Sequence, residues 1–373
     1  MTHHRALFVA YAGHLEGHGG VQLCTAEFID AIKVAGFELE VLAVMPDRRI
    51  STRALRRAFA SPYFRPLSSA SIAAIRARAP GNDYVFLNQM NLTGGLHRSD
   101  LSNVPAVGLS HGCEITDQLH LARLRRHLPL SSAQLRPHPT LALARTLRDE
   151  LAARKALDGV ICIAPFDADC ERWLGTTKVC WVPRTVRPSP LVRQPITGRF
   201  GTVGTLDHAP NLDGLVSVLT EIERTGNSDL TVRVVGGPER LGQWLKQNYC
   251  AVQYLGPLDQ TALAAEAATW NGFIHPIFCL PRGCSTKLSG AMAWALPIVT
   301  TPEGRRGYIW GDGALLETTS AATFVTAMRN LTSPYLDAEA AAAVTRAAAS
   351  SPTTVEVAQQ IAVFLQSIAV AER

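Results

Sequence analysis

The segment RGCSTKL, residues 282–288, carries the residue types of an anion-binding turn. Gly283 can supply the turn. The hydroxyls of Ser285 and Thr286 can cap a following helix, and Lys287 adds a positive charge to its first turn. A cation at a helix N-terminus opposes the helix dipole, so it needs an anionic partner, and a phosphate fits. The Walker pattern GxxxxGK[ST] is absent, so we expect phosphate binding outside a P-loop.

A second glycine-rich turn, GHGGVQ at residues 17–22, follows the first apolar run and opens a helix. Gly19 and Gly20 let a ligand approach the backbone, and the helix N-terminus favours an anion. The spacing is not GxGxxG, which argues against a nicotinamide dinucleotide. The alternative is a tight turn between strand and helix that binds nothing.

The segment SHGCE, residues 110–114, places His111 at the end of a predicted strand on the cleft side. Its role can be functional or only structural. Glu114 and Asp117 follow closely, so a hydrogen-bonded pair between His111 and one of these carboxylates is a further hypothesis.

The segment VGTLDHAPNLDGL, residues 203–215, combines a strand, a polar turn and a helix. Asp207 and His208 can face the cleft from this turn. Equally, Pro210 and Asn211 can do no more than start the helix.

The elements that must position these residues alternate between short apolar runs and stretches of helical periodicity. Strands are predicted at 5–13, 37–44, 84–89, 106–111 and 159–164, then at 199–205, 230–237, 252–256, 272–277 and 297–301. Helices are predicted at 17–36, 211–224, 238–248, 259–270, 286–296, 338–349 and 354–370. This alternation indicates an α/β protein with parallel sheets covered on both faces.

The proline-rich passage 182–198 separates the two series and is the predicted linker. We expect an N-terminal Rossmann-like domain at 1–190 and a second at 191–352. A C-terminal helix at 353–373 is expected to pack back on the first domain. Two doubly wound domains leave a cleft between the carboxyl ends of their strands, where ligands bind.

The composition fits two globular domains, because 373 residues with 47% hydrophobic and 18% charged side chains can bury sizeable cores. No uninterrupted apolar run approaches the roughly 18 residues of a membrane span. We interpret the first apolar run as a strand and not as a signal peptide. The 8 cysteines lack metal-ligand spacing, which indicates reduced thiols in a cytoplasmic protein.

The net charge of +5 is concentrated in the first half. Residues 1–190 hold 23 Lys and Arg against 16 Asp and Glu, and the remainder holds 13 against 15. Basic segments at 48–57 and 123–128 are either solvated helix faces or a surface for anionic lipid or substrate. An amphipathic basic helix within 48–59 predicts salt-sensitive peripheral association with the inner face of a membrane. No motif indicates nucleic acid as a partner.

The order of these motifs, from GHGGVQ through SHGCE and VGTLDHAPNLDG to STKLSGAMAWALPIVTTPEG, resembles the retaining GT-B glycosyltransferases of family 4. The resemblance covers nearly the whole chain and is strongest from about residue 200 to 305. It implies two Rossmann-like domains that face each other across a cleft, with residues 1–190 on the acceptor side and residues 191–352 on the donor side. It also implies transfer of a hexose from a nucleotide-sugar, with UDP, GDP or dTDP as carrier. The acceptor is expected to be a glycan, a lipid-linked sugar or another glycoconjugate, as in polysaccharide biosynthesis.

The resemblance also assigns roles to individual residues. His111 matches the catalytic-site histidine that touches the donor sugar, and Lys287 matches the lysine that clamps the donor diphosphate. The donor-phosphate set is expected to be Gly19, Gly20, Arg282, Ser285, Thr286 and Lys287. The nucleotide and sugar set is expected to be Gly204, Thr205, Gly256, Pro257, Leu258, Gly290 and Glu303.

The chain departs from the family pattern where two glutamates normally stand eight positions apart, because Arg282 and Gly290 occupy those positions. The first glutamate normally contacts the donor sugar and the second the ribose. Arg282 is expected to supplement Lys287 as a phosphate donor, and Glu303 is the nearest substitute for the ribose contact. Gly290 marks either close approach of a bulky group or a decayed site. We expect a glutamate there to clash, because Trp294 is large enough to crowd it.

Retaining transfer in this family is pictured as front-face attack in which the donor phosphate accepts the acceptor proton. Positioning and stabilisation of the leaving diphosphate are then the main tasks of the protein. We identify nothing that resembles a DxD metal site, so no obligatory metal and no cofactor is expected. The main alternative is a catalytically silent GT-B protein that binds a partner as a scaffold. An epimerase or hydrolase would need an acid–base cluster that the sequence lacks.

Overall fold

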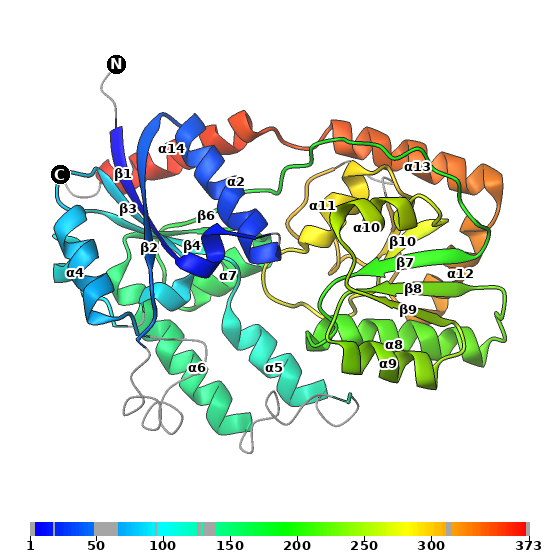
Figure 1. The fold of residues 1–373 in the computed structure, drawn as a ribbon. Coiled ribbons are helices and arrows are strands. Elements are labelled where there is room, and N and C mark those ends of the chain that lie inside the picture. The colour runs from blue at the N-terminus through cyan, green and yellow to red at the C-terminus, as the bar shows by residue number, and fades with distance from the viewer. Residues whose placement is uncertain are drawn as a thin grey trace.

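The chain folds into two α/β domains, and its last helix returns to the first of them (Figure 1). The structure is a computed structural model that describes residues 4–17, 19–47, 66–93, 95–124, 128–129, 139–310 and 315–370. The basic helix predicted within 48–59 lies outside these residues, as does most of the basic segment at 123–128.

Six parallel strands form the N-terminal sheet in the order β2-β1-β3-β4-β5-β6. They are β1 (His4–Tyr11), β2 (Phe37–Val44), β3 (Tyr84–Asn88), β4 (Ala106–Ser110), β5 (Gly159–Cys162) and β6 (Val179–Trp181). The α-helices of this domain are α1 (Ala12–Leu15), α2 (Gly20–Val34), α4 (Ser69–Arg78), α5 (Glu114–Leu124), α6 (Pro139–Ala153) and α7 (Pro165–Trp173). Short 3-10 helices are η1 (Met90–Thr93), η2 (Arg98–Leu101) and η3 (Arg154–Ala156).

Strand β1 is buried on both faces over Ala6–Tyr11, which explains its continuous apolar sequence. Ala6 and Phe8 join the core under α2, whereas Leu7 and Val9 join the core under α4. Successive side chains of a strand point to opposite faces, so an unbroken apolar run is what a sheet covered on both sides requires.

Six parallel strands also form the C-terminal sheet, in the order β12-β11-β10-β7-β8-β9. They are β7 (Arg199–Val203), β8 (Thr231–Val235), β9 (Val252–Gly256), β10 (Gly272–His275), β11 (Ile298–Thr300) and β12 (Leu316–Glu317). The helices are α8 (Ala209–Arg224), α9 (Glu239–Asn248), α10 (Gln260–Ala267), α11 (Thr286–Ala293), α12 (Ala321–Leu331) and α13 (Pro334–Ala349). The strand order reverses between β7 and β10, and such a point leaves a crevice at the carboxyl ends of the strands.

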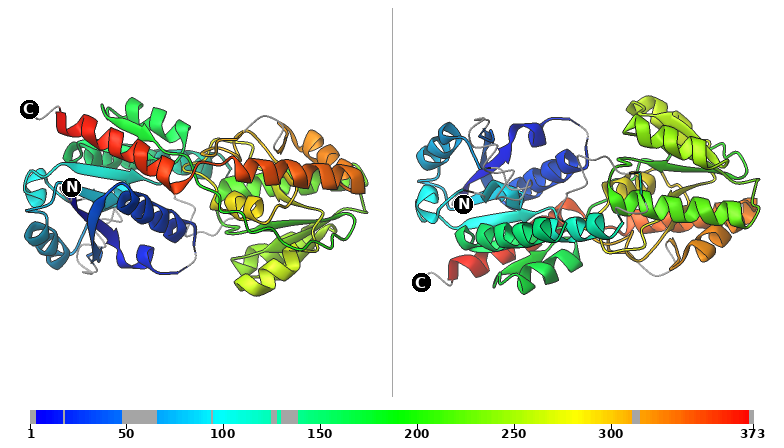
Figure 2. Two further views of the ribbon diagram at one scale, coloured as in Figure 1. Left: turned by 90° about the horizontal axis from the view of Figure 1, so that it is seen from above. Right: turned by 90° about the horizontal axis from the view of Figure 1, so that it is seen from below.

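Helix α14 (Thr354–Val370) lies along the N-terminal domain, whereas α13 before it lies along the C-terminal domain (Figure 2). Ile361 and Phe364 are buried in the core that α2 also covers, and the Tyr84 hydroxyl donates to the Leu365 carbonyl oxygen at 2.9 Å. The chain therefore crosses between the domains at the segment 182–198 and again before α14.

The predicted fold class, α/β with two doubly wound parallel sheets, is confirmed. The strands at 37–44 and 252–256 have the predicted bounds. The sequence analysis missed β6, β12 and α12, the first two because each has three residues or fewer. Within the described ranges, every helix is too short or too polar to cross a bilayer.

Candidate functional site

The N-termini of α2 and α11 meet at the interface between the domains. A Cβ atom placed on Gly20 would lie 2.9 Å from the hydroxyl oxygen of Thr286. Gly19 is the N-cap residue of α2, and Ser285 is the N-cap residue of α11. The positive ends of two helix dipoles thus converge where the sequence predicted phosphate binding.

The side chain of Lys287 crosses the turn that follows β7. Gly204 has a φ of +130°, and a Cβ atom there would collide with Cε and Nζ of Lys287. Lys287, Gly204 and Thr205 line one pocket of about 330 Å³ at the carboxyl ends of β7 and β10. The structure therefore brings these three predicted residues together at the reversal point of the C-terminal sheet.

The pocket holds more positive charge than nearby carboxylates neutralise. Burial, and then the charge of Arg306, lowers the pKa of Lys287 to about 8. Burial lowers the pKa of Arg306, and burial together with Lys287 lowers the pKa of His275. Among the described residues, no Asp or Glu forms an ion pair with Lys287 or Arg306. Partly buried cations without a carboxylate partner are costly, so the arrangement is suited to an anion.

Several polar atoms around the pocket are also buried without a hydrogen-bond partner in the described chain. These atoms are Nε2 of His275, Oγ of Ser285 and Nε of Arg306. The prediction that the Ser285 hydroxyl caps α11 is wrong, because Ser285 occupies the cap position without a side-chain cap hydrogen bond. Its hydroxyl is thereby left available to a ligand.

Arg282 does not serve the pocket in the predicted way. Its guanidinium forms ion pairs with Glu114 and, at 2.8 Å from Nε, with Asp117. Both carboxylates lie on α5 of the other domain, and His208 Nε2 lies 3.2 Å from the same Asp117 carboxylate. The expectation that Arg282 acts as a second phosphate donor is corrected, because its guanidinium forms ion pairs across the interface between the domains.

The pKa values of the two carboxylates of this network shift in opposite directions. Burial raises the pKa of Glu114 despite the nearby Arg282 charge. Burial acts the same way on Asp117, but the charges of His208 and Arg282 overcome it and hold the pKa of Asp117 well below its ordinary value. Asp117 is therefore the permanent anion of the network.

His111 lies at the end of β4 and is fixed from within its own domain. Its Nε2 donates to Oδ1 of Asn88 at 3.0 Å, and its ring lies 5.9 Å from the Phe28 ring. The hypothesis of a pair with Glu114 or Asp117 is wrong, because those carboxylates bind Arg282 and His208. The carbonyl oxygen of His111 instead packs on the turn that opens the segment 282–288.

The turn at Gly283 lies so close to the His111 backbone that only glycine fits there. Gly283 has a φ of +62°, and a Cβ atom there would collide with the His111 carbonyl oxygen. Its amide donates to Oδ2 of Asp167 at 2.8 Å, across the domain interface. Gly283 is thus required by the fit between the domains.

Gly290 occupies open space in α11. A Cβ atom built there meets nothing within 4 Å. The expectation that a neighbouring side chain crowds this position is therefore wrong, since Trp294 does not approach it that closely.

The remaining predicted residues line neighbouring turns. Gly256 ends β9 with a φ of +74°, and Pro257 and Leu258 follow, Leu258 packing on the C-terminal core. Glu303 lies in the turn after β11, and its carbonyl oxygen accepts from Arg306 Nη1 at 2.9 Å. Glu303 and residues 256–258 do not line the pocket that contains Lys287.

Sequence reasoning missed Arg306, His275 and Asn88. His275 is the last residue of the predicted strand 272–277, where ligand-facing side chains of parallel sheets lie. Arg306 follows the turn PEG after another predicted strand, and the same position argument could have found it. No group of three His, Cys, Asp or Glu side chains in the described parts of the chain is arranged to hold a metal ion.

Comparison with known proteins agrees with this geometry. The family described as Glycosyl transferases group 1 matches residues 197–333, which span the C-terminal sheet and its pocket. No curated protein matches the chain in sequence.

Solved structures similar to the whole chain include Anabaena HepE in complex with UDP and glucose, with a TM-score of 0.62, 14% identity and coverage of 98% of this chain and 100% of that one. The sucrose-phosphate synthase of Thermosynechococcus elongatus gives a TM-score of 0.62 at 15% identity, covering 99% and 100%. WaaG, a glycosyltransferase involved in lipopolysaccharide biosynthesis, gives 0.57 at 13% identity, covering 96% and 99%. The chain has the GT-B fold of these structures, and its residues 197–333 match the family described as Glycosyl transferases group 1.

Proposed function

We propose that this protein is a glycosyltransferase that transfers a hexose from a nucleoside-diphosphate sugar with retention of configuration. The observation that carries the proposal is the pair of partly buried cations, Lys287 and Arg306, left without carboxylate ion-pair partners beside the N-terminus of α11. A diphosphate supplies the missing negative charge. The similar structures support a nucleotide-sugar donor, since HepE holds UDP and glucose.

In this proposal, one group of residues binds the leaving diphosphate and another positions the sugar. Lys287, Arg306 and the helix N-termini at Gly20 and Thr286 stabilise the departing diphosphate as its charge develops. Front-face attack then lets a diphosphate oxygen accept the acceptor proton, so no separate protein base is needed. His111, held by Asn88, presents a rigid surface to the sugar.

Arg282 replaces a carboxylate of the family pattern and reverses the charge at that position. We propose that the carboxylates of Glu114 and Asp117 compensate for this change from the opposite domain. A catalytically silent scaffold remains the second candidate, favoured by the missing pair of glutamates at 282 and 290. The two candidates differ in whether a nucleotide binds and turns over.

A thermal-shift panel of UDP, GDP and dTDP, each free and as its glucose conjugate, tests the proposal. One nucleotide should raise the unfolding temperature strongly, and inorganic pyrophosphate should raise it weakly through the same cations. Hydrolysis or transfer from the matching sugar conjugate should follow. The scaffold candidate gains support if nothing in the panel shifts the transition.

The substitution Gly290→Glu is expected to leave the fold intact, because its Cβ enters open space. If the carboxylate is all that the ribose site lacks, nucleotide affinity should rise about 5- to 10-fold, the scale of one added hydrogen bond. Titration calorimetry on the variant measures this. The control Gly290→Gln keeps the size without the charge. Weaker binding in both variants would show that the position is used by the ligand itself.

We propose further that the basic segment within 48–59 carries the protein to an anionic membrane surface, near a lipid-linked acceptor. Each basic side chain contributes about 1 kcal/mol there, so binding should fall steeply with salt. Co-sedimentation with anionic and with neutral vesicles, at low and at high salt, measures it. Pelleting with anionic vesicles at low salt only is expected. Equal recovery in the supernatant under all four conditions would refute the membrane proposal and leave the transferase proposal untouched.

A further inference from the structure

Two cysteines from different domains meet directly behind the paired helix N-termini. Cys24 lies one turn beyond Gly20 on α2, and residues four apart share one face of a helix. Cys284 stands two residues before Thr286, which Gly20 contacts. Cys284 packs against the N-terminal core that contains Cys24, and the two thiols lie close enough that the pKa of each depends on the other.

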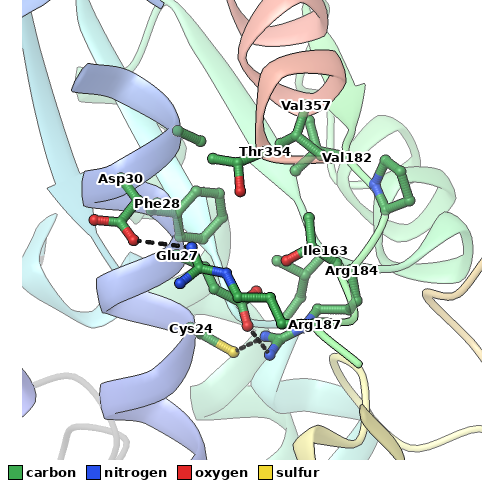
Figure 3. Close-up of a pocket in the computed structure, with 13 residues that line it drawn as sticks. Cys24, Glu27, Phe28, Asp30, Ile163, Val182, Arg184, Arg187, Thr354 and Val357 are labelled. Atoms are coloured by element: carbon green, nitrogen blue, oxygen red, sulfur yellow. Dashed lines mark hydrogen bonds and ion pairs between the residues drawn. The ribbon is translucent and has the colours of Figure 1, made fainter. Parts of the chain in front are cut away.

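Cys24 lines a pocket beside α2 (Figure 3). The pocket has an empty volume of about 420 Å³ and is lined by Cys24, Glu27 and Arg184. Arg187 and Asp30 also line it, and their side chains are 76% and 52% exposed. A small molecule can therefore approach Cys24 although that residue itself is only 4% exposed.

The surroundings of Cys24 favour reaction with an oxidant. The Arg184 guanidinium donates to Sγ of Cys24 and pairs with Glu27 at 2.7 Å. The neighbouring Cys284 thiol and the charge of Arg184 hold the pKa of Cys24 well below its ordinary value, against the effect of burial. A thiolate beside an arginine and a second thiol has the features of a redox-sensitive cysteine with its resolving partner.

We propose that Cys24 and Cys284 form a peroxide-oxidisable pair whose disulfide ties the two domains together. The Cys24 thiolate attacks hydrogen peroxide, giving a sulfenic acid and, after proton transfer, one water. The Cys284 thiol then attacks the sulfenic sulfur, which forms the S–S bond and releases a second water. Two thiols lose two electrons in total, and peroxide is reduced to two waters.

The disulfide would fix the N-terminus of α2 to the turn that opens α11. These two elements form the anion site, so oxidation should stop the domains from separating and slow ligand exchange. This consequence rests on the proposed function, whereas formation of the bond does not.

The test treats the native full-length protein with hydrogen peroxide and maps its peptides without reduction. We expect a linked pair of peptides containing residues 24 and 284, two hydrogens lighter than the separate peptides and split by dithiothreitol. Cys24→Ser and Cys284→Ser should each abolish the link. Cys250 is exposed and Cys250→Ser should not affect it, which makes that variant the matched control. Cys113 and Cys170, a thiol pair within the N-terminal domain, provide an internal reference.

Conversion of Cys24 to sulfinic acid without a linked peptide would overturn the proposal, as would a link formed only between Cys113 and Cys170. Release of bound UDP is then compared before and after oxidation, and a release rate at least 10-fold slower is expected. If UDP binds and the link forms but release is unchanged, the effect on exchange is wrong while the proposed function stands. If UDP does not bind at all, the peptide map still decides the disulfide.

Discussion

Changing Arg282 to glutamate is expected to separate the two domains, at a cost of about 3 kcal/mol or more in the free energy of their association. The guanidinium now pairs with Glu114 and Asp117, whose side chains are 10% and 13% exposed. Reversal leaves these carboxylates without a partner and adds a third negative charge beside them. Like charges at such short distances in a partly buried site repel strongly.

Small-angle scattering and urea unfolding measure this effect together. The radius of gyration should increase, and the single unfolding transition should split in two as each domain loses the support of the other. Arg240→Glu, which reverses an exposed arginine on α9, is the matched control and should change neither quantity.

A double variant that also changes Glu114 to arginine should recover part of the loss, because opposite charges again face each other across the interface. The arginine introduced at position 114 can also neutralise Asp117, one turn along the same helix. A radius that stays at the wild-type value in the single variant would show that the network does not hold the domains together.

The fold could be predicted from the sequence because its determinants are local. Largely apolar runs such as those of β3 and β4 are best satisfied in a sheet covered on both faces, and every residue of both strands is buried. Short edge strands escaped notice, since the two residues of β12 bury too little surface to leave a pattern. Helix α12 was also missed, although it buries Phe324, Val325 and Met328.

The site was predictable only in part, because its charges are arranged by contacts between distant residues. Lys287 and Gly204 could be named from local motifs, and the fold brings them together at one turn. The partners of Arg282 could not be named from local motifs, since Glu114 and Asp117 lie in another domain, some 165 positions away in the chain. A residue type alone therefore suggested phosphate binding for Arg282, where the structure shows a bridge between domains.

Replacing Lys287 with methionine is expected to weaken binding of a nucleoside diphosphate by about 1.5–3 kcal/mol, or roughly 10- to 150-fold. The pKa of about 8 leaves Lys287 mostly charged at pH 7 and mostly neutral at pH 9. Wild-type affinity for UDP or pyrophosphate should therefore fall as the pH rises through 8. Lys287→Arg keeps its charge over this range, so its affinity should lose that pH dependence. Titration calorimetry at pH 7 and pH 9 measures both effects.

The Lys287→Met variant should be more stable than the wild type when no ligand is bound. The pKa of Lys287 falls from 10.5 to about 8 on folding, so the folded state binds fewer protons between these values. The destabilisation is therefore complete below pH 8 and is lost as the pH rises through 10.5. Lys287→Met removes it, which should raise the free energy of unfolding at pH 7 by about 1–3 kcal/mol after allowance for partial solvent contact.

Binding and stability should thus change in opposite directions at one residue, which separates an anion site from an ordinary structural lysine. Lys246, exposed on α9, provides the control, and Lys246→Met should change neither quantity. A site evolved to receive a diphosphate tolerates an unpaired buried cation, because the ligand compensates the charge only when it binds. A variant at 287 that is less stable and binds UDP unchanged would mean that Lys287 supports the fold and that the anion lies elsewhere.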